Sequence, residues 1–421
     1  ACRGLETSPS RGGVPVAGEA SAMGLPLDGM RVVELSSFVA SPLGGMTLAQ
    51  LGADVIRVDQ IGGGPDIDRW PLAPSGRSLY WAGLNKGKRS VTVDLRSAEG
   101  RKMVADLIAE SGIVLTNAPR RDGLTYQQLR ERRPDLIYVQ LVGKRGGGNA
   151  VDYTVNAALG FPLVTGPEDH DGPVNHVLPA WDIACGLYLA VGLLAAERQR
   201  LRTGAGQYLE VALSDVALAT AGNLGYLAEA QFGEPRRRIG NHLFGDFGRD
   251  FATGDGRRVL VLTLSARHWR DLLAATGLGE VAEALERALG ADFTKAADRY
   301  TYREALCGIF TPWFAARTCG QIEEAFQGTS VLWARYRDFA ELVADDSAAL
   351  RAEPLIGELD QPGIGRHLAP GSPLVLGGLQ RPPAPAPLLG QHTDEVLGEL
   401  LSLPKDALDD LRARRVIGER E

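Results

Sequence analysis

The feature that most constrains this chain is an alternation of short β-branched runs with helix-like runs, which begins at Arg31. RVVELS is followed by PLGGMTLAQLG and ADVIRVD, and the pattern continues through SVTVDL (90–95), GIVLTN (112–117), LIYVQLVG (136–143) and QYLEVAL (207–213). Strands separated by helices of this length are joined by crossovers that build a parallel sheet covered on both faces. The sequence therefore predicts a doubly wound, Rossmann-like α/β domain.

The alternation stops near residue 235, which predicts a second, smaller α+β domain. There RRRIGNHLFGDFGRDFATGDGRR is rich in Gly and Arg, and its GDG turn separates the strand candidates DFATG and RRVLVLTL. Helix-like stretches follow to about Ala344, and a Pro-rich segment leads to a final helix with Thr393 as its expected N-cap. We expect a disordered leader over 1–22, a large domain over 23–230, a small domain over 235–345 and a further segment over 350–421, for which the resemblance described below implies a return to the large domain.

Charge and cysteine usage exclude several classes of function. A formal charge of −7 argues against general binding to nucleic acid or to anionic membranes. No apolar run approaches the ~20 residues that span a bilayer. The four cysteines lack CxxC spacing, so neither a disulfide framework nor a metal site is expected, and a reducing cytoplasm fits best.

Several segments suit a phosphorylated ligand without identifying one. The first strand-to-helix turn, SSFVASPLGG, has no GxGxxG, although the crevice beyond the strand carboxyl ends remains the default ligand site. LNKGKRS (84–90) contains Lys86, Lys88 and Arg89, which suit a polyphosphate but are equally typical of a solvated loop. His176 and His242 have no partners at metal-ligand spacing and receive no firm role.

The segment HVLPAWDIACG (176–186) places one carboxylate, Asp182, ahead of a long apolar helix expected over 183–202. One interpretation is an N-cap for that helix. The other is a carboxylate nucleophile that the helix N-terminus keeps ionised and oriented. The residues alone leave both interpretations open.

Taken in order, these motifs resemble the class III CoA-transferases, the family of formyl-CoA transferase, carnitine CoA-transferase and α-methylacyl-CoA racemase. The resemblance covers nearly the whole chain from about Leu25 and is carried by LDGMRVVELSS, LAQLGADVIRVD, NKGKRSVTVDLRSAEG, WDIACGLYLAVGLLAAERQRLRTGAGQYLEVALSD and APLLGQHTDEVL. It implies a two-domain enzyme whose first and last segments together make the large domain, and an interlocked homodimer.

The resemblance also implies covalent chemistry at Asp182. Its carboxylate would attack the thioester of an acyl-CoA to give a mixed anhydride, and the CoA thiolate would then form an aspartyl-CoA thioester. CoA enters as part of the substrate, so no permanently bound cofactor is expected. N–H groups near Gly245 and Gly248 would serve the oxyanion. The racemase branch is disfavoured, because GNAVDYTVN offers Asn149 where racemases have a histidine.

The positions of the family's CoA contacts fall on four short segments of this sequence. They are Val39 and Ala40; Val93, Asp94, Leu95 and Arg96; Asn117, Ala118 and Pro119; and Val142, Gly143 and Lys144.

Further segments, FVASPLGGMTLAQLGADVIRVDQIGGG, YWAGLNKGKRS, VDYTVN, PVNHVLPAWD and FGRDF, resemble the branch of the family that moves CoA between the two carboxyls of one mesaconate. The resemblance implies intramolecular transfer from the 1-carboxyl to the 4-carboxyl in a glyoxylate-assimilating pathway such as the 3-hydroxypropionate cycle. Arg249 or His242 would hold the idle carboxylate. The alternatives are an intermolecular transferase with a separate dicarboxylic acceptor, and a silent acyl-CoA-binding protein in which Asp182 is only a cap.

Overall fold

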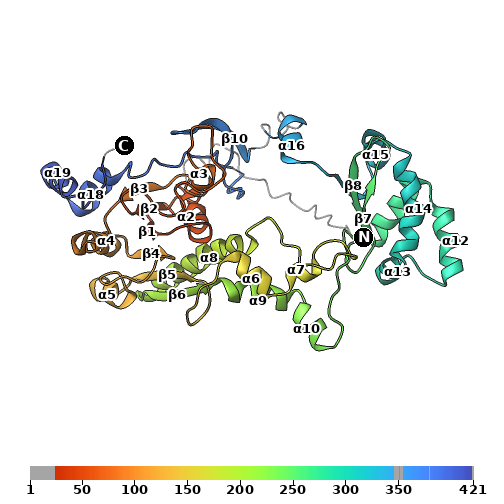
Figure 1. The fold of residues 1–421 in the computed structure, drawn as a ribbon, viewed down its shortest axis with the longest axis horizontal. Helices are drawn as coiled ribbons and strands as arrows, with labels where there is room; N and C mark the ends of the chain where they lie inside the picture. Colours follow the sequence, from red (N-terminus) through yellow and green to blue (C-terminus); the bar gives the residue numbers. More distant parts are fainter. Residues whose placement is uncertain (1–23, 346–349, 351–353, 379, 420–421) are drawn as a thin grey trace, which may run out of the picture. The chain divides into compact units, whose positions relative to one another are not determined.

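The computed structural model describes residues 24–345, 350, 354–378 and 380–419, and these form two compact units (Figure 1). The first unit takes the described residues up to Val155, Leu178–Thr220 and the described C-terminal segment. The second takes Asn156–Val177 and the chain from Ala221 to the end of helix α16 (Phe339–Asp345). Residues 156–177 and 221–230, which we expected in the large domain, thus belong to the second unit. The expected leader over 1–22 lies outside the described residues.

A six-stranded parallel sheet forms the centre of the first unit, so the predicted α/β fold class is confirmed. Its strand order is β3-β2-β1-β4-β5-β6, and every neighbouring pair is parallel. The strands are β1 (Arg31–Leu35), β2 (Asp54–Asp59), β3 (Arg89–Thr92), β4 (Ile113–Thr116), β5 (Ile137–Val142) and β6 (Gln207–Ala212). The order reverses at β1 and β4, and in open parallel sheets the carboxyl ends at such a reversal border the ligand crevice.

Helices cover the sheet as two groups. Helices α2 (Ala40–Gln50) and α8 (Ala180–Thr203) pack on each other and on the sheet. Helices α4 (Ala98–Ser111) and α18 (Thr393–Leu401) form the other group and also contact each other. Helix α4 packs on β1 and β4, and α18 packs on β3. The first unit also holds α3 (Leu79–Leu84), α5 (Tyr126–Arg132) and α19 (Lys405–Ala413), while α6 (Asp152–Ala158) and α9 (Leu213–Asn223) continue from it into the second unit.

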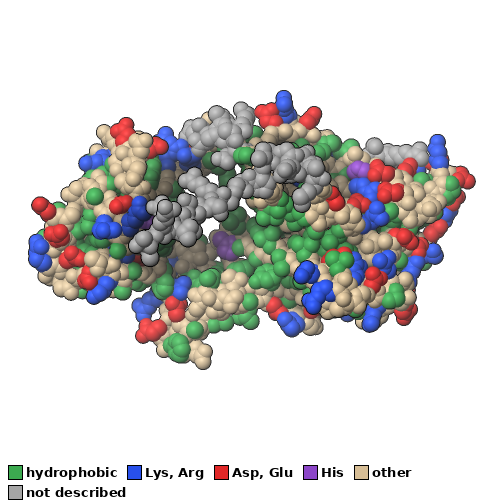
Figure 2. Space-filling view, turned by 180° about the vertical axis from the view of Figure 1, so that it is seen from behind, with side chains coloured by type: hydrophobic (Ala, Val, Ile, Leu, Met, Phe, Trp, Pro, Cys, Tyr) green, Lys and Arg blue, Asp and Glu red, His purple; other side chains and the backbone are tan. Residues whose placement is uncertain are grey.

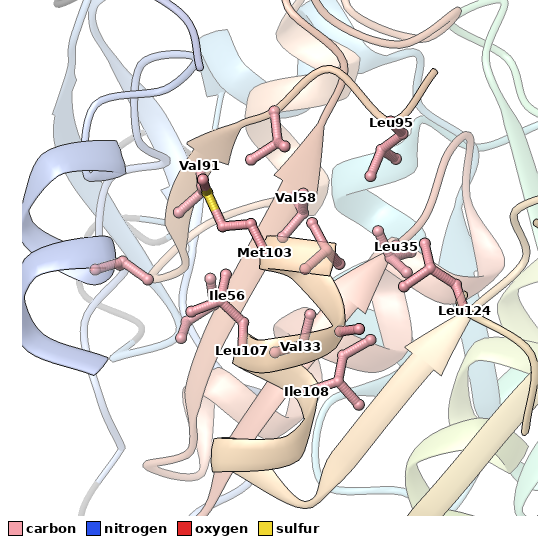
Figure 3. Packing of buried hydrophobic residues seen from close by; sticks show 14 of the residues in the cluster. Val33, Leu35, Ile56, Val58, Val91, Leu95, Met103, Leu107, Ile108 and Leu124 are labelled. Carbon is pink, nitrogen blue, oxygen red and sulfur yellow. The ribbon is translucent and has the colours of Figure 1, made fainter. Parts of the chain in front are cut away.

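Apolar side chains from neighbouring strands meet α4 in a core without solvent access (Figure 3). Val33, Ile56 and Val91 come from three strands and are fully buried together with Leu107 and Ile108 of the helix. Because helices cover both faces of the sheet, its central strands bury residues of both orientations. This explains why their sequences are continuous β-branched runs rather than alternating patterns.

The C-terminal segment completes the first unit along β3. Gly390 N–H donates to Ser90 Oγ at 2.9 Å, and Thr92 N–H donates to Thr393 Oγ1 at 3.1 Å. Strand β3 ends at Thr92 rather than at residue 95, because Val93 pairs with Ile417. Thr393 is therefore not the expected N-cap: it is the first residue of α18, and its hydroxyl holds β3 instead. The segment before it forms a hairpin of β10 (Ile356–Gln361) and β11 (Gly365–Pro370), which the sequence analysis missed.

The second unit is α+β, with a three-stranded antiparallel sheet in the order β7-β8-β9. Strand β9 interrupts a stretch that we expected to be helical throughout; it pairs with β8, and its side chains alternate between exposed and half-buried. The elements of the second unit are α7 (Phe161–Val164), α10 (Tyr226–Gln231), β7 (Gly248–Ala252), β8 (Arg258–Leu262), α11 (Ala266–Thr276), α12 (Gly279–Leu289), α13 (Ala296–Thr301), α14 (Arg303–Ala315), α15 (Cys319–Phe326), β9 (Leu332–Arg335) and α16.

Helix α8 is long and apolar enough, by length and composition, to cross a membrane. From the sequence we expected no such segment. The helix packs against α2, β5 and β6, and its buried residues include Cys185, Leu189 and Leu193. A core helix of a globular unit has the same composition, so this property does not by itself indicate a membrane span.

The crossing of α2 and α8 depends on two glycines. The nearest neighbour of a Cβ on Gly186 would be the Ala40 carbonyl oxygen, at 2.7 Å, and a Cβ on Gly44 would lie 3.0 Å from the Gly186 carbonyl oxygen. Both contacts are with backbone, which cannot rotate away. Gly at these positions therefore lets the two helix backbones approach each other directly.

We expect Gly186→Ala to lower the free energy of unfolding by about 1–3 kcal/mol, because overpacking outweighs the ~1 kcal/mol by which Ala favours a helix over Gly. Gly398→Ala in α18 is the matched control, since the nearest atom to its added Cβ lies at 3.7 Å. Urea titrations of the two variants should move the midpoint in opposite directions. A Gly186→Ala variant as stable as the wild type would contradict the close crossing.

Candidate active site

The turns after β1 and β4 are joined directly at the point where the strand order reverses. The Asn117 side chain accepts the Ser37 N–H at 3.0 Å and donates to the Ser37 carbonyl at 2.9 Å. Phe38, the next residue, has a positive φ of 65°, and its N–H donates to Asp66 Oδ2 at 3.0 Å. The turn that leads into α2 is thus fixed by side chains from two other segments.

Three of the four segments expected to contact CoA follow strands that are neighbours in the sheet. Val39 and Ala40 follow β1 and lead into α2, both buried; Asn117, Ala118 and Pro119 follow β4; and Val142, Gly143 and Lys144 end or follow β5. Since parallel strands end at the same edge, these residues lie along one edge of the sheet.

The fourth segment follows β3, the outer strand at the far end of the sheet order. Val93 and Leu95 are buried in the core, and Asp94 N–H donates to the Val416 carbonyl at 2.9 Å. Arg96 is exposed and pairs with Asp94 at 3.0 Å. Of this segment, the Arg96 side chain is the group most open to a ligand.

Asp182 does not cap the helix it was expected to cap. Helix α8 begins at Ala180, with Pro179 at the N-cap position and no side-chain hydrogen bond there, so Asp182 is the third helical residue. Its side chain is half-buried, and the described residues give its carboxylate no hydrogen bond. The capping interpretation is therefore wrong, and the carboxylate remains available.

Asp152, thirty residues earlier, supplies the missing cap. Its Oδ2 accepts the N–H of Trp181 at 2.7 Å and of Asp182 at 3.2 Å. The side chain is buried, and its second oxygen, Oδ1, has no hydrogen-bond partner in the described part of the chain. Sequence reasoning missed this residue, although VDYTVN was noted, because an acid capping a distant helix leaves no local spacing pattern.

The surroundings of Asp182 favour its protonated form. Burial, followed by the negative charge of Asp152, raises its pKa from 3.8 to about 6, and the positive charge of Arg69 opposes this. With this pKa the carboxylate is still mostly ionised at neutral pH, as a nucleophile requires. Burial, with a smaller contribution from Asp182, also raises the pKa of Cys185 to about 12, so this neighbouring thiol stays protonated near neutral pH.

Of the three cations that suited a polyphosphate, Lys86 and Lys88 are buried inside the first unit, and Arg89 is half-buried and paired with Asp54, Glu395 and Glu399. Arg57 pairs with Asp59 at 2.8 Å and with Asp66 at 3.2 Å, and Lys88 pairs with Glu34 at 2.8 Å. Lys86 is also buried and donates to the Gly83 carbonyl at 2.9 Å. They therefore form neither a solvated loop nor a phosphate site.

The expected substrate residues outside this sheet all lie in the second unit. Gly245 precedes β7 with a φ of 84°, and Gly248 is the first residue of β7. Arg249 Nη1 lies 3.5 Å from Glu304, and His242 Nε2 lies 2.9 Å from the same carboxylate. Arg249 and His242 thus share one acid.

His176 also lies in the second unit, and its Nε2 lies 2.9 Å from Asn156 Oδ1. This contact joins two residues of the second unit.

The sequence and the fold of this chain both match a known family. The sequence profile of CoA-transferase family III matches residues 27–393. The chain belongs to this family. One relative of this family III CoA-transferase is the 2-methylfumaryl-CoA isomerase of Chloroflexus aurantiacus, 48% identical over 398 residues that cover 93% of this chain and 97% of the relative. The succinyl-CoA:mesaconate CoA-transferase of Haloarcula hispanica is 30% identical, with 89% and 96% covered.

Solved structures agree with this assignment. A CaiB/BaiF family protein from Brucella suis aligns with a TM-score of 0.73 at 26% identity, covering 90% of this chain and 100% of that one. The predicted fold and the predicted class of enzyme, a class III CoA-transferase, are both confirmed.

The raised pKa of Asp182 predicts a pH-dependent gain in stability for Asp182→Asn. When the pKa of an acid is higher in the folded state than in the unfolded state, the acid lowers the stability of the fold as the pH rises from the unfolded-state pKa through the folded-state pKa. Near pH 4 the substitution should change little. Above about pH 6 it should stabilise the protein by at most about 3 kcal/mol, for a shift of roughly two units.

Thermal unfolding at pH 4 and pH 8 measures this difference, with Glu131→Gln on the exposed side of α5 as the control. An Asp182→Asn variant that is less stable than the wild type at pH 8 would show that the carboxylate has a stabilising partner.

Proposed function

We propose that this enzyme converts 2-methylfumaryl-CoA to 3-methylfumaryl-CoA by moving CoA between the two carboxyls of one mesaconate, with Asp182 as the nucleophile. The observation that carries the proposal is the Asp182 carboxylate itself, half-buried in the first turn of α8 and without a hydrogen-bond partner in the described residues. The 48% identical relative named 2-methylfumaryl-CoA isomerase supports the choice of substrate.

In this mechanism Asp182 attacks the thioester carbonyl, which releases CoA as a thiolate and leaves a mixed anhydride. The thiolate then attacks the aspartyl carbonyl, giving an aspartyl-CoA thioester and free mesaconate. The other carboxylate of mesaconate attacks this thioester, which releases the CoA thiolate and forms a second mixed anhydride. The thiolate then attacks the mesaconyl carbonyl of this anhydride, which gives the isomeric thioester and restores Asp182. With a pKa of about 6, Asp182 is largely ionised at neutral pH, yet its partial burial reduces the solvation that would weaken it as a nucleophile.

An intermolecular transferase is the second candidate. It is favoured by the 30% identical relative named succinyl-CoA:mesaconate CoA-transferase, whose name describes a donor and a separate acceptor. The two candidates differ only in whether the free acid leaves the site between the half-reactions.

The remaining residues of the site are also part of the proposal. The turns after β1, β4 and β5 would hold CoA, joined by Arg96 after β3. A cytoplasmic enzyme of glyoxylate assimilation fits this chemistry.

We also propose that the enzyme is a homodimer. Ile183, Leu187, Tyr188 and Val191 are exposed along one face of α8, at the helical spacing of a packing surface. Apolar side chains form continuous areas on the molecular surface (Figure 2). A second copy of the chain would cover such apolar surface, as the family resemblance implies.

Isotope transfer tests the proposed reaction. The protein is incubated with 2-methylfumaryl-CoA and excess labelled free mesaconate, and the two thioesters are separated. We expect unlabelled 3-methylfumaryl-CoA, because the mesaconate stays in the site between half-reactions. Labelled thioester would establish the intermolecular transferase. Asp182→Asn should lower turnover by at least about 1000-fold, because it removes the covalent route; unchanged turnover would exclude Asp182 as the nucleophile.

Asp152→Asn separates the charge of Asp152 from its capping role. The amide oxygen still accepts the N–H groups of Trp181 and Asp182, but the negative charge that adds to the effect of burial on the pKa of Asp182 is gone. The wild-type kcat/KM should fall as pH drops below about 6, and in Asp152→Asn this acid limb should move to lower pH. Asp152→Ala should instead lose turnover at all pH values. An unmoved acid limb in Asp152→Asn would mean that the limb does not report Asp182.

A further inference from the structure

Arg69 is a cation without an acidic partner in the described chain, held beside the turn that leads into α2. Its guanidinium carbon lies 5.3 Å from the centroid of the Phe38 ring and 4.8 Å from that of Tyr80. Its backbone is fixed as well: the Arg69 N–H donates to the Asp66 carbonyl at 3.2 Å, and the Ser78 hydroxyl donates to the Arg69 carbonyl. Aromatic faces orient a guanidinium while leaving its N–H edge open to hydrogen-bond acceptors.

The helix crossing places this cation beside the nucleophile. Phe38 stands two residues before Ala40, whose carbonyl oxygen meets Gly186 of α8. Asp182 lies one helical turn before Gly186, on the same helix. In agreement with this placement, the Arg69 charge acts on the pKa of both Asp182 and Tyr80, in each case opposing the increase that burial causes.

Arg69 differs in this respect from Arg57, Lys88 and Arg249, and it differs from the buried Lys86 in being partly exposed. Arg57 and Lys88 are buried in ion pairs, and Arg249 shares Glu304 with His242. A cation left unpaired next to a nucleophile suits a substrate that brings its own negative charge.

We propose that Arg69 binds the carboxylate of the acyl group that is not reacting, and so selects dicarboxylic acyl-CoA substrates. This specificity role rests on the proposed function of Asp182. While Asp182 attacks the thioester at one end of the acyl group, the guanidinium donates two N–H bonds to the carboxylate at the other end. Once free mesaconate has formed, the same cation accepts either end, so one residue serves both half-reactions.

The test compares two thioesters that differ in one group. 2-Methylfumaryl-CoA carries the second carboxylate, and (E)-2-methylbut-2-enoyl-CoA has a methyl group in its place. The rate at which each forms the covalent CoA adduct of the protein is followed by intact mass in a single turnover. Arg69→Met should slow adduct formation from the dicarboxylic thioester by about 10- to 100-fold and leave the rate with the monocarboxylic thioester unchanged. With the dicarboxylic thioester, the rate for Arg69→Lys should lie between those of the wild type and Arg69→Met, since lysine keeps the charge but not the paired N–H donors.

Arg130→Met on the exposed side of α5 is the matched control and should change neither rate. Equal losses with both thioesters, or no loss with either, would overturn the role of Arg69. If the wild type forms the adduct but no 3-methylfumaryl-CoA, the isomerase proposal fails while the comparison of thioesters still decides the role of Arg69. Calorimetry with free mesaconate needs no turnover, and equal affinity in wild type and Arg69→Met would also overturn it.

Discussion

A network of buried charges beneath the β1–α2 turn is the constraint on which the candidate site depends. Lys88 bonds to Glu34, and Arg57 bonds to Asp66, all within the interior of the first unit. Buried charges are tolerated only when they are paired, and removing one partner typically costs about 3–5 kcal/mol. Asp66 also accepts the Phe38 N–H. The network therefore fixes the conformation of the turn against which α8 and its carboxylate are placed.

Much of the fold could be predicted from the sequence because the central strands are buried on both faces. Their continuous β-branched runs gave the inner strands, and the outer strands β3 and β6 were predicted as well, although β3 proved shorter once Val93 paired with Ile417. Three strands outside this sheet were missed. Strand β9 and the β10–β11 hairpin are short and partly exposed. Their strand conformation depends on pairing with neighbouring strands rather than on a hydrophobic pattern within each segment.

The candidate site was predictable only in part. Asp182 stood out because it precedes a long helix, and the family resemblance gave it a role. Asp152 and Arg69 did not stand out, since each acts across the fold: one caps a helix thirty residues away, and the other lies against Phe38 and Tyr80. The basic segment at 84–90 could not be predicted, because buried lysines and solvated lysines look alike in sequence.

The C-terminal segment, which is hydrogen-bonded to β3, has a consequence for how the chain is synthesised. Ser90, Thr92 and Val93 receive their partners from Gly390, Thr393 and Ile417, three hundred or more residues later. During synthesis the ribosome must therefore add the whole second unit before this edge of the sheet can be covered. Until then the sheet presents an unprotected strand edge, the kind of surface on which partly made chains associate with one another. Truncation near the end of the gene would leave every subunit in that state.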